Sequence, residues 1–137
     1  MKKRFSNKWK GSKQPRKQRK YLANAPRATQ RKFLSSHLSK ELRKKYGKRS
    51  MSLRKNDVVK VMVGEYKNKE GKISGINMKN LKVAIEGLQI TKRDGSKVNV
   101  WICPSKLLVK ELVMEDKKRL AAMQKKNNKI NKTEGEK

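Results

Sequence analysis

A strand–loop–strand pattern between residues 54 and 76 constrains the fold more than any other part of the sequence. Its first half is a dense apolar run, consisting of Val58, Val59, Val61, Met62 and Val63. β-Branched residues pack well on a pleated sheet. Gly64 and Gly71 bracket a polar loop with lysines at its tip, and a second apolar run ends at Ile76. Glycine permits unusual backbone angles and close approach of another segment, so the pattern predicts a hairpin with a phosphate-facing loop.

Alternating apolar and polar residues predict further half-buried strands after this hairpin. They occupy residues 81–86 and 97–102, and a last short strand follows at residues 106–109. Asp94–Gly95, a pair that favours tight turns, stands between residues 89–93 and the strand beginning at Lys97. Five short strands joined by tight turns predict a mainly β protein with a small closed barrel, since closure removes exposed sheet edges.

The two faces of these strands predict which side chains are buried. Val59, Val61 and Val63 share one face of the first strand and are expected in the interior. Trp101 falls on the face opposite the valines, where it either covers the barrel, the interpretation we favour, or stacks on a nucleic-acid base. Cys103 is expected as a small buried residue.

The charge of the chain is strongly positive and unevenly distributed. Its 137 residues include 40 Lys and Arg against 11 Asp and Glu, a formal net charge of +29, and the mean hydropathy is −1.04. Residues 1–56 hold 21 basic residues and one acid. Such charge destabilises a compact state through self-repulsion. It therefore predicts a polyanionic partner, and nucleic acid is favoured over a membrane because no long apolar stretch is present.

Residues 1–25 form a basic N-terminal segment with too little apolar surface to offset the entropy of ordering. We expect this segment to be disordered in the free protein. Its basic groups suit RNA phosphates, and Trp9 and the other interleaved rings suit unpaired bases. A solvated tail or an import signal is the alternative interpretation.

Residues 26–47 predict two short helices, because Leu34, Leu38 and Leu42 recur at a four-residue step that one straight helix would not keep on a single face. We expect the break near residues 35–36, Ser39 as the second N-cap and Gly47 as the stop. A basic linker covers residues 48–56. A third helix is expected at residues 114–126, followed by a disordered tail at 127–137.

Enzyme chemistry has little support in this composition. The chain holds one Cys and one His, so no disulfide or zinc site can be assembled from them. It shows no Walker-type phosphate-binding loop and no paired carboxylates in the barrel segment. We expect no cofactor, no metal and no small-molecule substrate. The N-terminus lacks the apolar region of a secretory signal, which fits a cytoplasmic protein.

The hairpin resembles the KOW motif, a signature of SH3-like barrels in ribosomal and transcription proteins. The matching residues are Asp57, Val58, Val59, Val61, Gly64, Lys67, Gly71 and Ile73. The family usually has glycine directly after the loop lysine, where this chain has Asn68. Asn tolerates a left-handed backbone better than most residues, so we expect the loop shape to be kept. A KOW transcription factor that contacts polymerase is a second interpretation, although such proteins usually carry further domains.

A wider resemblance covers roughly residues 13–120. Four segments are similar to one family of large-subunit ribosomal proteins: NAPRATQRK (24–32), SSHLSKELRKKYGKRSMSLRKNDVVKV (35–61), DGSKV (94–98) and PSKLLV (104–109). This is the family called L twenty-six in eukaryotes and L twenty-four in bacteria and archaea. Cys103 replaces a histidine that is frequent there, which removes one candidate RNA contact.

The resemblance implies a structural constituent of the large ribosomal subunit. Members bind rRNA near its 5′ end, approach the 5.8S region in eukaryotes, act early in assembly, contact neighbouring ribosomal proteins and lie near the exit of the nascent-peptide tunnel. Assembly would be nucleolar in a eukaryote. Together with the charge pattern, the resemblance predicts RNA contacts at Lys3, Arg4, Lys8, Trp9, Lys10, Lys13, Arg16, Lys17, Arg19, Lys20, Arg27, Arg31, Lys32, Arg43, Lys44, Lys48, Arg49, Arg54, Lys55, Gly64, Tyr66, Lys67, Asn68, Lys69, Gly71, Ser105 and Lys106.

Overall fold

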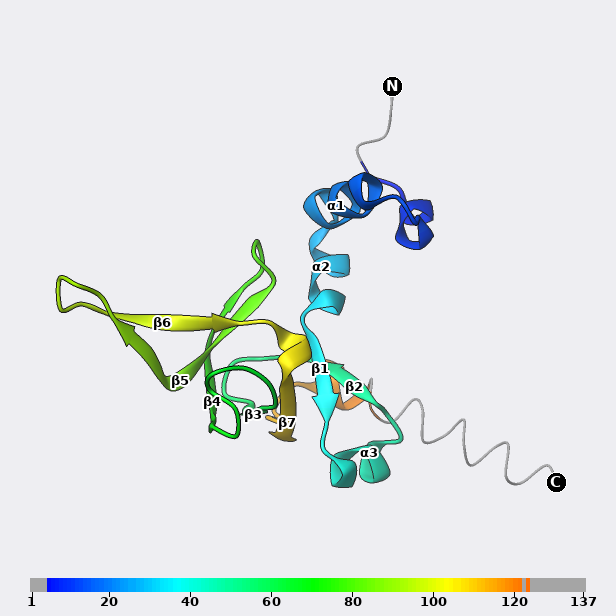
Figure 1. Cartoon of the computed structure of the whole chain (residues 1–137). Helices are drawn as coiled ribbons and strands as arrows, with labels where there is room; N and C mark the ends of the chain where they lie inside the picture. Colours follow the sequence, from blue (N-terminus) through cyan, green and yellow to red (C-terminus); the bar gives the residue numbers. More distant parts are fainter. Residues whose placement is uncertain (1–4, 122, 124–137) are drawn as a thin grey trace.

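The fold is built on one seven-stranded sheet with the strand order β2-β1-β7-β3-β4-β5-β6 (Figure 1). The structure is a computed structural model that describes residues 5–121 and 123. Its strands are β1 (Ser35–Leu38), β2 (Ser50–Ser52), β3 (Val58–Val61), β4 (Glu70–Asn77), β5 (Lys82–Thr91), β6 (Lys97–Ile102) and β7 (Leu107–Glu111). Its helical elements are η1 (Asn7–Gly11), α1 (Pro15–Asn24), α2 (Arg27–Phe33), α3 (Lys40–Tyr46) and η2 (Pro104–Lys106).

The sheet confirms a mainly β protein with helical extensions, but the five-stranded closed barrel is not confirmed. In the described residues the strands pair in an open order, and two strands from before the expected barrel extend it. β1 lies parallel to β7, with His37 opposite Leu108, and antiparallel to β2. β1 joins the sheet because it buries apolar surface and a polar group against β7. Leu38 is fully buried, and the Ser36 hydroxyl donates a hydrogen bond to the carbonyl of Leu107.

The two predicted short helices are present as α2 and α3. Ser39 caps α3 by accepting a hydrogen bond from the amide of Leu42, and Gly47 ends the helix with a left-handed φ of +58°. Between the helices, where only a break was expected, the chain forms β1. The four-residue leucine step therefore does not mark one helical face, because Leu34 is the C-cap of α2 and Leu38 lies in β1, and both are buried.

The core is formed by side chains of β1 and of β3 to β7 and contains Val59 and Val61 as predicted. Val63 was expected there but is exposed, because β3 ends at residue 61 and the chain turns away. Val98 is exposed as well, since the distal part of the β5–β6 ribbon projects away from the rest of the sheet (Figure 1). Cys103 is exposed rather than buried, and its neighbour Pro104 occupies the buried position.

The β5–β6 hairpin confirms the turn predicted at residues 94–95. The amide of Lys92 donates to the carbonyl of Ser96, and Gly95 has a φ of +81°. The side chain of Asp94 accepts two hydrogen bonds from Ser96, which lower the pKa of that carboxyl. β5 runs as one strand through residues 82–91, with Gly87 at a φ of +77° inside an irregular stretch.

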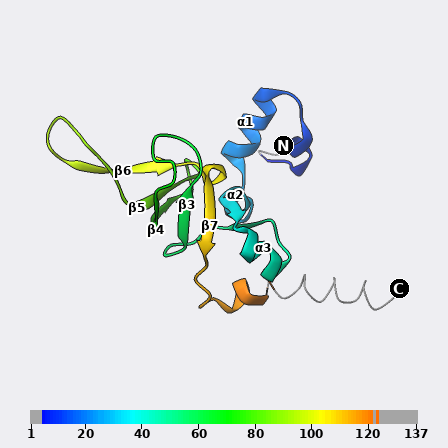
Figure 2. The same cartoon turned by 60° about the horizontal axis from the view of Figure 1, so that its bottom comes forward.

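The N-terminal segment, predicted to be disordered in the free protein, contains two helical elements in the described residues, η1 and α1. Tyr21 supplies the physical reason, because it is buried and contacts two other rings. Its ring stacks on Phe5 with centroids 5.2 Å apart and meets the edge of Phe33 at 5.7 Å. In both views α1 lies beyond α2, on the side of α2 away from α3 (Figures 1 and 2).

Gly71 in β4 is predicted to be essential for the close approach of β4 and β5. A Cβ atom at this position would lie 2.8 Å from Cγ2 of Ile85 and 2.9 Å from the carbonyl oxygen of Glu86. Gly71→Ala should therefore lower the free energy of unfolding by about 1–3 kcal/mol through overpacking, measured by urea denaturation. Gly11→Ala is the matched control, because nothing lies within 4 Å of a Cβ there. Equal stability of the two variants would contradict the close-approach role.

Candidate nucleic-acid interface

The loop between β3 and β4 is a compact turn held by its own backbone. Gly64 has a φ of +109° and Asn68 a φ of +67°, so Asn68 adopts the left-handed conformation expected of it. The amide of Asn68 donates to the carbonyl of Val61 at 2.9 Å, and the amide of Val61 donates to the carbonyl of Lys69 at 2.9 Å. This loop therefore presents a fixed shape, which we call the KOW loop (residues 64–71).

Side chains of the KOW loop divide into an anchor and an exposed tip. Tyr66 packs against the core, and the Lys69 ammonium lies 5.1 Å from the centre of its ring. Lys67 and Asn68 are exposed at the tip. Gly71 is half-buried and lies close against β5, where an added Cβ would meet Ile85 and Glu86, so it has a structural role as well as its predicted RNA contact.

The structure brings the KOW loop next to η2, which carries the exposed Ser105 and Lys106. The amide of Met62 donates to the carbonyl of Lys106 at 2.8 Å, which ties the two segments together. A hollow of about 310 Å³ is lined by residues of both segments, among them Gly64 and Tyr66. Two sequence segments that were predicted separately thus form one surface.

A second basic surface covers residues 5–33, from η1 through α2, and we call it the basic arm. All ten of its Lys and Arg residues are exposed, and the segment holds no acidic residue. They are Lys8, Lys10, Lys13, Arg16, Lys17, Arg19, Lys20, Arg27, Arg31 and Lys32. Trp9 is half-buried, with the ammonium of Lys20 5.0 Å from its ring centre. The predicted contacts Lys3 and Arg4 lie outside the described residues.

The remaining predicted contacts differ in how far they are available to RNA. Lys44, Arg49 and Lys55 are exposed, and Lys48 is half-buried. Arg43 donates from Nε to the carbonyl of Leu38 at 2.7 Å, so part of its guanidinium serves the protein itself.

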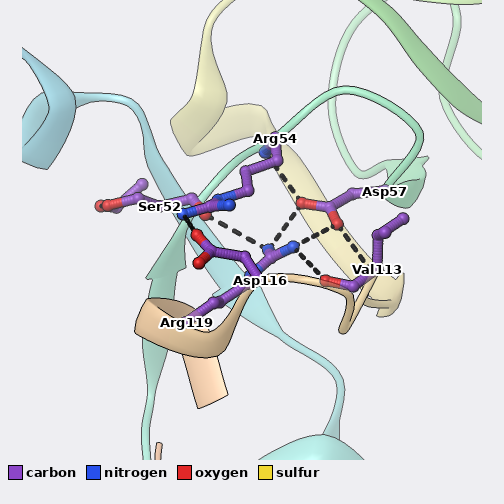
Figure 3. A network of polar contacts seen from close by, with 7 residues as sticks. Ser52, Arg54, Asp57, Val113, Asp116 and Arg119 are labelled. Carbon is purple, nitrogen blue, oxygen red and sulfur yellow. Dashed lines mark hydrogen bonds and ion pairs between the residues drawn. The ribbon is translucent and has the colours of Figure 1, made fainter. Parts of the chain in front are cut away.

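Arg54 also has a partner within the chain, since its guanidinium forms an ion pair with Asp116 (Figure 3). The pKa of the Asp116 carboxyl is lowered, chiefly by a hydrogen bond from the amide of Lys118 and further by the Arg54 guanidinium. Glu70 is likewise paired with a cation, because the ammonium of Lys110 binds it at 2.6 Å and lowers its pKa.

A buried ion pair between Asp57 and Arg119 holds the base of the KOW hairpin (Figure 3). Two nitrogens of the Arg119 guanidinium donate to the two oxygens of Asp57, each at 2.7 Å. Asp57 also accepts from the amides of Arg54 and Val113, at 2.9 and 3.0 Å. Arg119 donates further to the carbonyls of Val113 and Ser52, at 2.9 and 3.3 Å. All these partners anchor the sheet to the segment after β7.

Sequence reasoning identified Asp57 as a motif residue but missed Arg119, which stands 62 positions later. No local pattern points from one to the other. The helix expected at residues 114–126 begins later, since the chain is helical at 117–121 and at 123, and the expected tail at 127–137 lies outside the described residues. The exposed Lys79, just after β4, was also not predicted as a contact.

Metal-binding clusters and membrane-spanning helices are both absent from the described residues. These residues contain no group of three or more His, Cys, Asp or Glu side chains that could hold a metal ion. No helix among them is long and apolar enough to cross a membrane.

A mainly β structure that carries an acid-free basic arm and a compact loop with two exposed lysines, in a chain of net charge +29, defines a strongly cationic protein. The sequence model of one family, the eukaryotic ribosomal proteins L26 and their archaeal L24 counterparts, matches residues 12–126. The chain belongs to this family of ribosomal proteins.

Curated relatives support the assignment. Large ribosomal subunit protein uL24 of Methanosphaera stadtmanae is 40% identical over 84% of this chain and 98% of its own length. The uL24 proteins of Korarchaeum cryptofilum and Methanocorpusculum labreanum are 41% and 44% identical over 87% and 82% of this chain, covering 91% and 93% of their own lengths. The family consists of ribosomal proteins and not of enzymes, which confirms the prediction that the chain is not an enzyme.

Removing Arg119 should leave the Asp57 carboxylate buried without its cation. Arg119→Met is therefore expected to lower the free energy of unfolding by about 3–5 kcal/mol, measured by urea denaturation. Arg54→Gln is the control, because it removes a half-exposed ion pair of the same network and should cost only about 0–1 kcal/mol. If both substitutions cost the same small amount, the buried pair does not hold the hairpin as described.

Proposed function

We propose that this protein is a structural constituent of the large ribosomal subunit that binds rRNA through the basic arm, the KOW loop and η2. The family assignment supports the ribosomal part, since the relatives it matches are large-subunit proteins by name. In this role the protein works on ribosomes in the cytoplasm and contacts neighbouring ribosomal proteins as well as RNA.

One observation carries the RNA-binding part of the proposal. The basic arm exposes ten cations and holds no acid over 29 residues, from 5 to 33. A protein surface with this composition repels itself unless a polyanion lies against it. Packed rRNA helices, whose phosphates repel each other, are the partner that such an arm neutralises.

The KOW loop and the arm have different parts in the proposed mechanism. Hydrogen bonds within the loop and the contact of Gly71 with β5 hold the loop in one shape, so Lys67 and Asn68 meet RNA in a fixed position. Strands β3 to β7, with η2 between the last two, act as the SH3-like scaffold that presents this loop. The arm, in contrast, lies along RNA backbone and supplies phosphate contacts without sequence preference.

The resemblance noted in the sequence extends the proposal to place and time. The rRNA region bound is the one near the 5′ end, the protein enters the subunit early in assembly, and its final position is near the exit of the nascent-peptide tunnel. Early binding is consistent with the physical role, because neutralising phosphates allows RNA helices to approach each other before later proteins join.

Sedimentation of a cell lysate through a sucrose gradient tests the ribosomal part. We expect the protein to travel with the large subunit and to stay there after a high-salt wash, because an arm threaded between RNA helices is not released by screening alone. Recovery at the top of the gradient, or with RNA polymerase, would overturn the proposal in favour of a transcription factor.

Salt dependence of binding to a large-subunit rRNA transcript tests the RNA contacts. If about 10 phosphates are neutralised, the logarithm of the binding constant should fall with the logarithm of the salt concentration at a slope of about −7 to −9. Lys67→Gln should reduce the steepness by about one, measured by filter binding. Lys110→Gln is the matched control, since its ammonium is paired with Glu70. A slope near zero for the unmodified protein would contradict phosphate binding.

A further inference from the structure

A groove runs along α2 on the side that faces the end of β4. It consists of two hollows, of about 280 and 590 Å³, that share Ile76 and Met78 in their walls. The first has an apolar floor formed by Leu34 and Leu53, which are both buried. The second opens towards Trp101. We call the two hollows together the α2 groove.

The charge of the α2 groove has one sign. Five basic side chains line it, and no acidic side chain does so in the described part of the chain. The basic residues are Arg27, Arg31, Arg54, Lys55 and Lys79. Arg54 forms an ion pair with Asp116, but Arg27 and Arg31 belong to the basic arm and are exposed. The groove is therefore a continuation of the surface for which RNA is the proposed partner.

Trp101 provides a ring at the open end of the groove. It is 42% exposed, so a large part of the ring is open to a partner while the rest lies over the sheet. Pairing with Ala84 holds its backbone in β6, and Cη2 of its indole lies 3.7 Å from where a Cβ on Gly75 would stand. The ring is thus positioned by the sheet before any partner arrives.

An exposed, fixed aromatic ring beside cations is the arrangement with which proteins hold unpaired bases. Base–aromatic stacking is tolerant of sequence and gives a large part of the affinity for single strands. The side-chain amides of Gln30 and Asn77 also line this hollow, and amide side chains hydrogen-bond to base edges. The oxygen of Asn77 accepts from the amide of Asn80 at 3.0 Å, so its NH2 group is the part left for a base. A peptide partner would use the cations but would leave this combination of ring and amides unexplained.

We propose that the α2 groove binds one unpaired nucleotide of the RNA, with its base stacked on Trp101 and its flanking phosphates held by Arg27 and Lys79. The inference rests on the proposed rRNA-binding function and adds to it a recognition site for single-stranded RNA. The KOW loop and the basic arm would then position the RNA, and the groove would select a bulge or loop in it.

Tryptophan fluorescence tests the proposal directly, because stacking of a base on an indole quenches its emission. The chain has two tryptophans, so the Trp9→Phe variant leaves Trp101 as the only reporter. This variant is titrated with a short single-stranded oligoadenylate and with a blunt RNA duplex of equal length. We expect the single strand to quench Trp101 and the duplex to bind with little quenching.

Affinity measurements on further variants in this background define the site. Trp101→Ala should weaken binding of the single strand by about fivefold to 100-fold, the usual effect of removing a stacking ring, and leave duplex binding unchanged. Trp101→Phe should keep much of the affinity. Val98→Ala is the matched control, because Val98 is an exposed apolar residue of the same strand that does not line the groove. Arg27→Gln should reduce by about one the steepness with which the logarithm of the binding constant falls with the logarithm of the salt concentration.

The outcomes separate this inference from the proposed function. If the single strand binds with a steep salt dependence but neither quenches Trp101 nor distinguishes Trp101→Ala from Val98→Ala, the groove proposal is overturned and RNA binding stands. If neither RNA binds, the proposed function itself fails. The quenching experiment uses the Trp9→Phe variant, which keeps Trp101. It therefore tests the groove even if the Trp101→Ala variant fails to fold.

Discussion

The buried ion pair of Asp57 and Arg119 is the interaction on which the arrangement of the molecule depends. Desolvating two charges costs several kcal/mol per ion, and this cost is offset only when the geometry is good and the remaining hydrogen-bonding groups are satisfied. Both oxygens of Asp57 accept two hydrogen bonds each, from the guanidinium and from backbone amides. On the Arg119 side the two terminal nitrogens are fully engaged, and only the buried Nε has no hydrogen-bond partner in the described residues. These contacts join the start of β3, the segment after β7 and the C-terminal helical segment. The KOW hairpin is thereby fixed at its base before it meets any partner.

Several acidic residues bind cations of the same chain, while most of the Lys and Arg side chains remain on the surface. Asp57, Glu70 and Asp116 each bind a Lys or Arg of the same chain, which ties distant segments to the sheet. The basic arm contains no acid at all, so its charges have no such partners in its own segment. The result is a small stable sheet that carries a large unneutralised charge. This division explains how one modest domain remains folded while it presents a strongly cationic surface to RNA.

Local patterns predicted those parts of the fold that neighbouring residues determine. Asp94–Gly95 formed its turn, Ser39 and Gly47 bounded a helix, and Asn68 took the left-handed conformation, because each depends on the backbone preferences of one or two residues. β1 was not predicted. Its four residues pair with a strand about seventy positions away, and Ser and His have no strong preference for strands. The closed barrel was inferred from the number of strands, which does not reveal how the outermost strands pair.

The sequence by itself determined the mainly β class, the KOW hairpin, the distribution of charge and the family, because these follow from composition, short patterns and residue identity. Only the tertiary structure decided that Arg119 neutralises Asp57 and that Gly71 lies against β5. It also decided that Val63, Val98 and Cys103 face solvent. The physical reason is that contacts between distant segments depend on register and on where each strand ends. A shift of one residue moves a side chain to the other face of a sheet, and local sequence does not encode that shift.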